Sequence, residues 1–402
     1  MRGVEQSLEG GHRWSQLVLI ALVAVLVMSL WFSASAVVPR LHDSWHLSSA
    51  DATWLTTSVQ IGFVVGAVGS ALFNLADLLS TRRLIAISAL AGAAANAAVA
   101  AWATGLTSAV PLRFLTGVAL AGVYPPALKL MASWFSSDRG LALGTVVGAL
   151  ALGSGSPHLI GAWTGLSWRE VLVVASAAAV IGALLVWLAV RDGPLMAASP
   201  PFHPGYVARM FRDPPQRLVS FGYFGHMWEL YAVWTWLPSY VAASFVAAGD
   251  PGHHSAVELA SFAAIGIAGL AGSLWAGLAA DRGSRASVTI VAMGVSGGCC
   301  LLSAVVYGLS PVLVVGMLLV WGMAVLADSA QFSTALTEVA DRSYVGTALT
   351  AQTAIGFLIT VISIRLLPTV EAQVGWRWAF VPLALGPALG IVAMVRARRV
   401  IG

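Results

Sequence analysis

The sequence predicts an all-α polytopic membrane protein made of two six-helix halves, and three observations support this fold class. Hydrophobic residues make up 58% of the 402 residues and charged residues only 9%, whereas about a quarter of a soluble domain is charged. Apolar runs of about 20 residues, the length that crosses a bilayer, recur twelve times. A proline-rich, basic segment without such a run interrupts the series after the sixth. We therefore expect halves at 1–191 and 217–402, joined by a cytoplasmic linker at 192–216.

The first run could be mistaken for a cleaved leader. Arg2 and Arg13 precede it, and Ala34-Ser35-Ala36 at its end resembles a signal-peptidase site. We interpret it as a membrane helix, because it is long enough to span and its removal would leave one half a helix short. The twelve spans are expected near 15–39, 54–78, 84–104, 107–135, 141–163, 168–190, 217–243, 256–280, 286–308, 311–337, 346–367 and 375–395.

The distribution of arginine predicts the orientation, because cytoplasmic loops carry an excess of basic residues. With the N-terminus inside, 15 arginines fall on the cytoplasmic side and four outside. The outer four are Arg40, Arg169, Arg365 and Arg377. We therefore expect a multi-pass protein of the plasma membrane, a bacterial inner membrane, with both termini cytoplasmic. The net charge of +4 is then explained without nucleic acid as a partner.

The two halves repeat in sequence. Asp77 and Asp281 follow the second and eighth spans at an offset of 281 − 77 = 204. Trp168 and Trp376 open the sixth and twelfth spans at 376 − 168 = 208. Similar offsets indicate a duplicated six-helix unit. Parallel repeats of this kind are typical of secondary transporters that rock around a substrate site near the bilayer midplane.

The loop after the eighth span resembles the loop motif of the major facilitator superfamily. Its residues are Gly277, Asp281, Arg282 and Arg285. The resemblance extends over the chain through its twelve spans and its repeat, and it implies the fold of that family, in its bacterial twelve-helix form with two pseudo-symmetric halves. The glycine would let two helix ends approach, and the charges would form a cytoplasmic gate that breaks as the halves rock. A positive-inside loop without a gating role is the alternative.

The first-half copy of this motif is degenerate. Phe73 replaces the glycine, and Arg82 and Arg83 arrive one place late. The resemblance still implies Asp77 as the acid of the first-half gate, with Arg82 beside it.

The fourth span resembles the family's fourth-helix motif, in which an arginine faces the interior. Arg113, Gly117 and Tyr124 lie near one helical face, and a membrane-embedded arginine usually faces a cavity or a partner. Binding a substrate anion or relaying protons competes here with a structural role in bonding neighbouring backbone. Lys129, the single lysine, is expected to snorkel to the inner interface, and a pair with Asp328 on the tenth span is the alternative.

The seventh span carries Glu229 near its centre and His226 three residues earlier, on about the same face. An ionised acid is costly at that depth, so burial favours a protonated form. This is the chemistry of a proton-coupling site, in which His226 could share the proton. The alternatives are a permanently bonded structural glutamate and a hydrogen-bonded core histidine.

Further candidates for the substrate cavity are Trp31, Asp328 and Gln331. Trp31 on the first span is the repeat partner of Trp234, at 234 − 31 = 203, and it lies too deep for interfacial anchoring. Packing is the alternative role. No metal site is expected, because the histidines and acids of the outer loops do not form a complete ligand set, and Cys299 and Cys300 are interpreted as packing residues.

These features predict a proton-coupled secondary active transporter that works by alternating access, is not an enzyme and needs no cofactor. No phosphate-binding loop of the Gly-x-x-x-x-Gly-Lys type occurs, which argues against ATP as energy source. The expected partners are a small solute, protons and the lipid bilayer, with the monomer as working unit. Arg113 and Lys129 favour a small organic or inorganic anion. Efflux of amphipathic or cationic compounds is the alternative, and an intramembrane enzyme is a remote one.

Overall fold

The computed structural model describes residues 2–75, 79–135, 137–162, 166–196, 202–250, 254–341 and 343–401. These residues form helices and connecting loops without strands. Within them, twelve helical segments are long and apolar enough to cross a membrane, which confirms the predicted number of spans. The first half has α1 (Arg2–Phe32), η1 (Ser35–Val37), α2 (Val38–Trp45), α3 (Ser49–Leu72), α5 (Thr81–Trp102), α6 (Leu106–Ala121), α7 (Tyr124–Ala132), α8 (Arg139–Gly161) and α9 (Trp168–Leu188).

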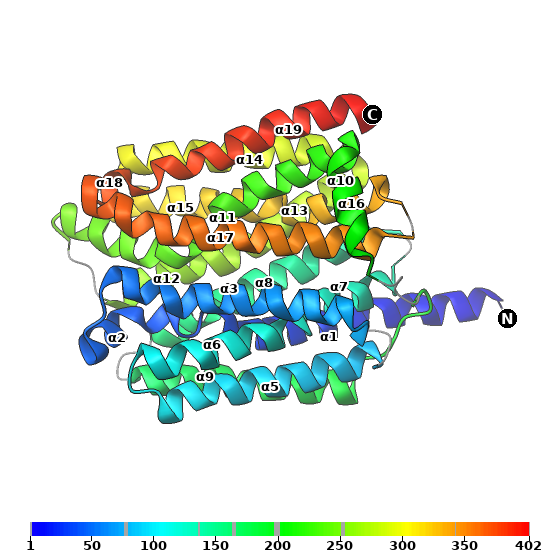
Figure 1. Ribbon diagram of the computed structural model, residues 1–402, viewed down its shortest axis with the longest axis horizontal. Coiled ribbons are helices and arrows are strands. Elements are labelled where there is room, and N and C mark those ends of the chain that lie inside the picture. The colour runs from blue at the N-terminus through cyan, green and yellow to red at the C-terminus, as the bar shows by residue number, and fades with distance from the viewer. Residues whose placement is uncertain are drawn as a thin grey trace.

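The second half follows a short helix, α10 (Pro204–Arg212). Its elements are α11 (Pro214–Ala247), α12 (His254–Phe262), the π-helical segment η2 (Ala263–Ala268), α13 (Gly269–Arg282), α14 (Arg285–Val306), α15 (Pro311–Ala327), α16 (Ser329–Val339), α17 (Val345–Val374), α18 (Trp376–Ala379), η3 (Val381–Ala384) and α19 (Leu385–Ile401). Figure 1 shows the halves lying against one another, with both chain ends at one end of the bundle. We call this the terminal end, and the opposite one the distal end.

Local signals in the sequence explain where several spans begin. The Ser48 side chain accepts a hydrogen bond from the backbone of Asp51, and the Asp51 side chain accepts one from the backbone of Ser48. Ser167 and Glu170 form the same reciprocal cap before α9. Such capping boxes satisfy backbone donors that a helix start leaves unpaired. The two caps therefore define distal helix starts in the first half.

Two spans that correspond in the repeat are each broken near their middle. In the fourth span, α6 ends at Ala121 and α7 starts at Tyr124, followed by two prolines, which lack backbone donors. In the tenth span, α15 ends at Ala327 and α16 starts at Ser329, with Asp328 between them. Interrupted helices carry polar groups into the bilayer where they line a protein interior. Asp328 is thereby held at depth, 1% exposed.

The halves meet along a seam in which α8 packs against α12, η2 and α13, while α3 packs against α17. Contact at the terminal end depends on missing side chains: a Cβ on Gly277 would lie 2.5 Å from the carbonyl oxygen of Gly140. Toward the distal end, a Cβ on Gly155 would lie 3.1 Å from the backbone nitrogen of Gly266. At both points α8 therefore packs backbone to backbone against the second half, which holds the seam closed there.

The start of the linker lies against the first half, where the Gly193 backbone donates to Ser133 Oγ at 3.0 Å, and its helix packs on the second half. In α10, Tyr206 stacks on Tyr344 at a ring-centroid distance of 4.4 Å, and its hydroxyl donates to Gln216. Just before α10, the backbone nitrogen of His203 donates to Thr347 at 3.0 Å. From His203 onward the linker is thus a short helix that packs against the second half.

Candidate functional site

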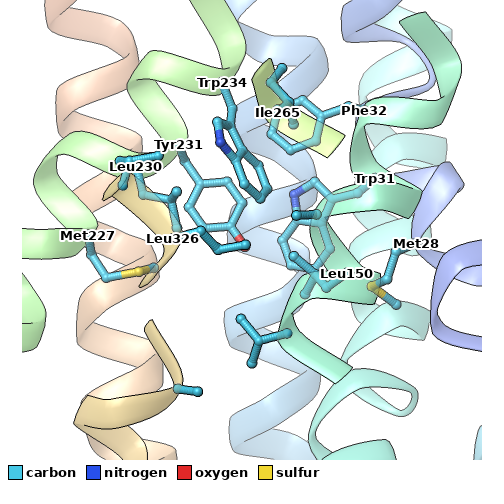
Figure 2. Close-up of a cluster of buried hydrophobic side chains, with 14 of the residues drawn as sticks. Met28, Trp31, Phe32, Leu150, Met227, Leu230, Tyr231, Trp234, Ile265 and Leu326 are labelled. Atoms are coloured by element: carbon cyan, nitrogen blue, oxygen red, sulfur yellow. The ribbon is translucent and has the colours of Figure 1, made fainter. Parts of the chain in front are cut away.

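Four aromatic rings from both halves meet at the centre of the bundle. The Trp31 ring stacks on Tyr231 with centroids 5.7 Å apart and lies 5.4 Å from Phe357. Phe63 and Phe357 are 4.6 Å apart. Figure 2 shows Trp31 and Tyr231 converging with their neighbours Phe32 and Trp234. We call Trp31, Phe63, Tyr231 and Phe357 the central aromatic cluster.

Buried polar groups without a protein partner lie in and beside this cluster. Within the described residues, Trp31 Nε1 and both amide atoms of Gln60 have no hydrogen-bond partner, and both side chains are fully buried. Gln60 precedes Phe63 by three residues, nearly one helical turn, so the two side chains lie near one face of α3. An unmet buried donor or acceptor costs about 1–3 kcal/mol. The cluster therefore combines flat apolar surface with uncharged groups that would bond a solute.

Arg113 lies on α6 and supports this region from behind. Its guanidinium donates to the carbonyl oxygen of Leu30 at 2.9 Å, to that of Leu55 at 3.2 Å and to that of Trp31. It also donates to the Asn96 side chain at 2.9 Å. These bonds hold the end of α1, and with it Trp31, against α3 and α5. They match the structural alternative for Arg113, because its nitrogens point at backbone.

Glu229 lies buried in α11, 1% exposed. Its carboxylate accepts hydrogen bonds from Trp321 Nε1 at 2.6 Å, Ser296 Oγ at 2.9 Å and Cys300 Sγ at 3.2 Å. All three donors belong to the second half, on α14 and α15. Three donors stabilise the ionised form of a carboxylate, and all three lie in the half that carries Glu229.

His226 and Asp328 form a second buried pair within the second half. His226 Nδ1 lies 2.9 Å from Asp328 Oδ1, an ion-pairing distance whose angles fall outside hydrogen-bond geometry. Among the described residues, His226 Nε2 has no hydrogen-bond partner. The structure thus brings His226 to Asp328, while Glu229 has its own set of donors. His226, which contacts Asp328, and Glu229 lie three residues apart on about the same face of α11.

The remaining predicted cavity residues, Tyr124 and Gln331, lie at or just beyond the mid-span breaks of the fourth and tenth spans. Tyr124 opens α7 and is partly buried, as is Lys129 on the same helix. Gln331, on α16, accepts a hydrogen bond from Arg285 Nη1 at 3.1 Å. Arg285 also pairs with Glu338 at 2.8 Å. Gln331 is therefore joined to the second half's terminal loop, and the Lys129–Asp328 pair stays a prediction.

Asp281 crosses between the halves at the terminal end. Its carboxylate accepts the backbone N–H groups of Gly140 at 2.9 Å and Leu141 at 3.0 Å, at the start of α8. A carboxylate at a helix N-terminus is stabilised by the unpaired donors and the helix dipole. The predicted acid and glycine of the motif, Asp281 and Gly277, thus both contact α8. The partner of the acid is a helix end.

The predicted gate arginines have other contacts. Arg82 pairs with Asp192 at 3.2 Å inside the first half, and Arg285 pairs inside the second, as described above. Arg282 ends α13 next to Asp281. Asp77 lies outside the described residues. The ion pairs of Arg82 with Asp192 and of Arg285 with Glu338 therefore do not connect the two halves.

We expect Asp281→Asn to loosen the terminal end. The change removes the negative charge at the helix end and one of two strong acceptors, which costs about 1 kcal/mol, or roughly a fivefold shift toward the terminal-open state. Distances between spin labels across the terminal end measure this shift. The matched control is Asp192→Asn, whose partner Arg82 lies in its own half; equal shifts in both variants would contradict a gate at Asp281.

The sequence reasoning missed several residues of the site. Ser296, Cys300 and Trp321 bond Glu229 but lie in apolar runs without a local signal, and Cys300 does more than pack. His158 and Glu258 form a further buried pair. For Glu258 a signal existed, because any acid within a membrane span is a functional candidate.

Comparisons with known proteins agree with this architecture. The family model described as Major Facilitator Superfamily matches residues 20–364. Among curated proteins, none matches the chain. The chain is similar in structure to the proton:xylose symporter XylE bound to 6-bromo-6-deoxy-D-glucose, with a TM-score of 0.74, 12% identity, and 98% of this chain and 97% of the other covered.

Two further solved structures resemble the chain over nearly its full length. XylE from E. coli in a partially occluded inward-open conformation has a TM-score of 0.71 at 14% identity, with 97% and 99% of the two chains covered. A bacterial homologue of the human lysosomal transporter Spinster, inward-facing and unoccupied, has a TM-score of 0.70 at 15% identity, with 96% and 97% covered. At these identities the likeness shows the fold.

Proposed function

Because the chain belongs to the Major Facilitator Superfamily, whose family model covers residues 20–364, we propose that it is a secondary active transporter that moves a small solute by alternating access. The observation that supports this most is the central aromatic cluster, to which each half contributes two rings. Rocking of the halves would part these rings and expose the polar groups beside them. The protein would act as a monomer in a bacterial inner membrane, with its terminal end in the cytoplasm because most arginines lie there.

We propose a solute with a flat apolar face and uncharged hydrogen-bonding groups. The expectation of an anion depended on Arg113 and Lys129, and the donors of Arg113 are directed to backbone carbonyls and Asn96. The unpartnered groups by the cluster, Trp31 Nε1 and the Gln60 amide, are neutral. Aromatic faces also pack well against apolar ring surfaces. Hydroxylated ring compounds such as sugars fit this chemistry, and the bound ligand of the similar XylE structure is a sugar derivative.

Export of amphipathic cations is a second candidate. The rings of the cluster would attract a cation through their faces, and the buried carboxylates of Glu229 and Asp328 would offset its charge. Both acids are 1% exposed. The solute panel and the direction of transport separate this candidate from uptake of a neutral solute.

Proton coupling is tested with a Glu229→Gln variant in proteoliposomes. Glutamine keeps the size and the acceptor oxygen of the side chain but cannot exchange a proton, so we expect accumulation driven by a pH gradient to be lost while solute exchange without a gradient remains. Internal pH and labelled solute are recorded for neutral sugars, anions and cationic drugs. Glu338→Gln, at an exposed acid of the same half, is the control. Gradient-driven uptake that survives in Glu229→Gln would show that this residue is structural.

A further inference from the structure

A buried acid–histidine pair crosses the seam between the halves near the distal end. His158 in the last turn of α8 places Nδ1 2.7 Å from Oε2 of Glu258 in α12, and both side chains are 2% exposed. The other buried acid sites, Glu229 and the His226–Asp328 pair, have their recorded partners inside the second half. Proton exchange at the His158–Glu258 pair would therefore act directly on the contact between the halves.

Two further charged or titratable side chains surround the pair. Arg40, from α2, donates to the carbonyl oxygen of Gly161 at 2.9 Å and lies 3.1 Å from His254 Nε2. His254 Nε2 in turn lies 3.7 Å from the other oxygen of Glu258, and this histidine is 44% exposed. The nearby elements η1 and η2 contain no titratable side chain. His254 thus lies between solvent and the buried pair.

The burial of the pair favours one overall charge and therefore one number of bound protons. The 2.7 Å contact between Nδ1 and Oε2 has hydrogen-bond length whichever atom carries the proton, so the burial of the pair decides its favoured charge. At 2% exposure a net charge on the pair is costly, whereas one shared proton makes it neutral overall. When the distal end opens, water reaches both groups; fully hydrated side chains in peptides have pKa values of about 6.5 for histidine and 4.3 for glutamate. Above about pH 6.5 the opened pair therefore holds no titratable proton.

We propose that His158 and Glu258 form a proton-binding latch of the distal gate, which takes up one proton from the distal side as the gate closes. This inference assumes the alternating access proposed above and adds a proton site that the two halves share. The proton enters on His158 or Glu258, lies between Nδ1 and Oε2 in the closed seam, and leaves when the distal end opens. Because the closed state binds the extra proton, distal opening becomes more favourable as the pH rises above about 6.5.

The test measures distal opening directly, without solute. Spin labels are placed at Thr104 in the first half and Leu309 in the second, which are exposed positions in distal loops. In the wild type we expect the open population to be steady between about pH 5 and 6.5 and then to rise by up to about tenfold per pH unit. A population that instead increases as the pH falls from about 6.5 to 5 would mean that the closed pair carries no shared proton, which would overturn the latch.

Two variants predict opposite changes. In Glu258→Gln the closed seam buries a neutral histidine that gains a proton only when hydrated, so the dependence is inverted and acid below about pH 6.5 opens the gate. In His158→Gln the closed seam buries a protonated glutamate, so the onset of opening moves down by about two pH units, toward 4.3. If one variant does not fold, the other still tests the sign. A wild-type profile in both would contradict the proposal.

The exposed neighbour supplies the matched control. His254→Gln removes a titratable histidine beside the pair but leaves the 2.7 Å contact in place, so the wild-type profile is expected to persist. Loss of the profile in this variant would assign the proton to His254 and overturn the latch. Labels that never separate under any condition would instead contradict alternating access, and labels that separate without pH dependence would contradict the latch alone.

Discussion

A Gly277→Ala variant is expected to lose most of its transport while it still folds. The new Cβ would lie 2.5 Å from the carbonyl oxygen and 2.8 Å from the carbonyl carbon of Gly140. Both atoms are backbone, so no flexible side chain can move aside. Separating α13 from α8 would also pull Asp281 away from the amides of Gly140 and Leu141. Overpacking of this kind costs about 1–3 kcal/mol, which shifts the population toward the terminal-open state by roughly 5- to 150-fold.

The measurement combines initial rates of solute exchange with label distances across the terminal end. Gly294→Ala is the matched control, because a Cβ at that position on α14 meets no atom within 4 Å. It should leave both rate and distances at wild-type values. A Gly277→Ala protein that keeps the wild-type distances would show that the close approach of α8 and α13 does not gate the terminal end.

The spans were predictable because they depend on one averaged property, the length of apolar runs. Breaks within the spans depend on individual residues. The interruption of the fourth span was not predicted, although two prolines follow Tyr124, and the interruption at Asp328 has no proline. It carries a buried acid whose partner, His226, is on another helix. A local reading of the tenth span could not have found that contact.

The gate motif illustrates a different limit. The sequence predicted Gly277 and Asp281 as residues of a gate between helix ends and suggested arginines as partners of the acid. In the structure the acid accepts the amides of Gly140 and Leu141. Backbone donors at a helix start belong to no residue type, so a sequence pattern cannot identify them. A gating role for the motif arginines, Arg282 and Arg285, stays a prediction.

Contacts between distant residues account for the other omissions. Glu229 was recognisable from its depth, but its donors Ser296, Cys300 and Trp321 lie 67, 71 and 92 residues away in sequence. His158 and Glu258 are 100 residues apart and meet only because the halves close. Hydropathy assigns each residue to a span but does not determine which neighbouring helix its side chain faces. Packing of the helices determines which polar groups meet.

Arg113→Gln should destabilise the folded protein rather than change its choice of solute. Glutamine has two donors, whereas the guanidinium reaches the carbonyls of Leu30, Trp31 and Leu55 and the Asn96 side chain. The substitution leaves buried acceptors unpaired at the junction of α1, α3 and α6. Each buried acceptor left without its donor costs about 1–3 kcal/mol. We therefore expect a markedly lower melting temperature in detergent and less folded protein.

The control for Arg113 is Arg365→Gln. Arg365 is exposed, with its guanidinium 4.2 Å from the centre of the Trp54 ring, so its loss should cost no more than about 1 kcal/mol. If Arg113→Gln keeps the wild-type melting temperature but no longer binds anions, Arg113 is a solute ligand and the anion expected from the sequence is correct. If both melting temperature and solute binding fall together, Trp31 loses its place because the backbone that carries it is no longer held.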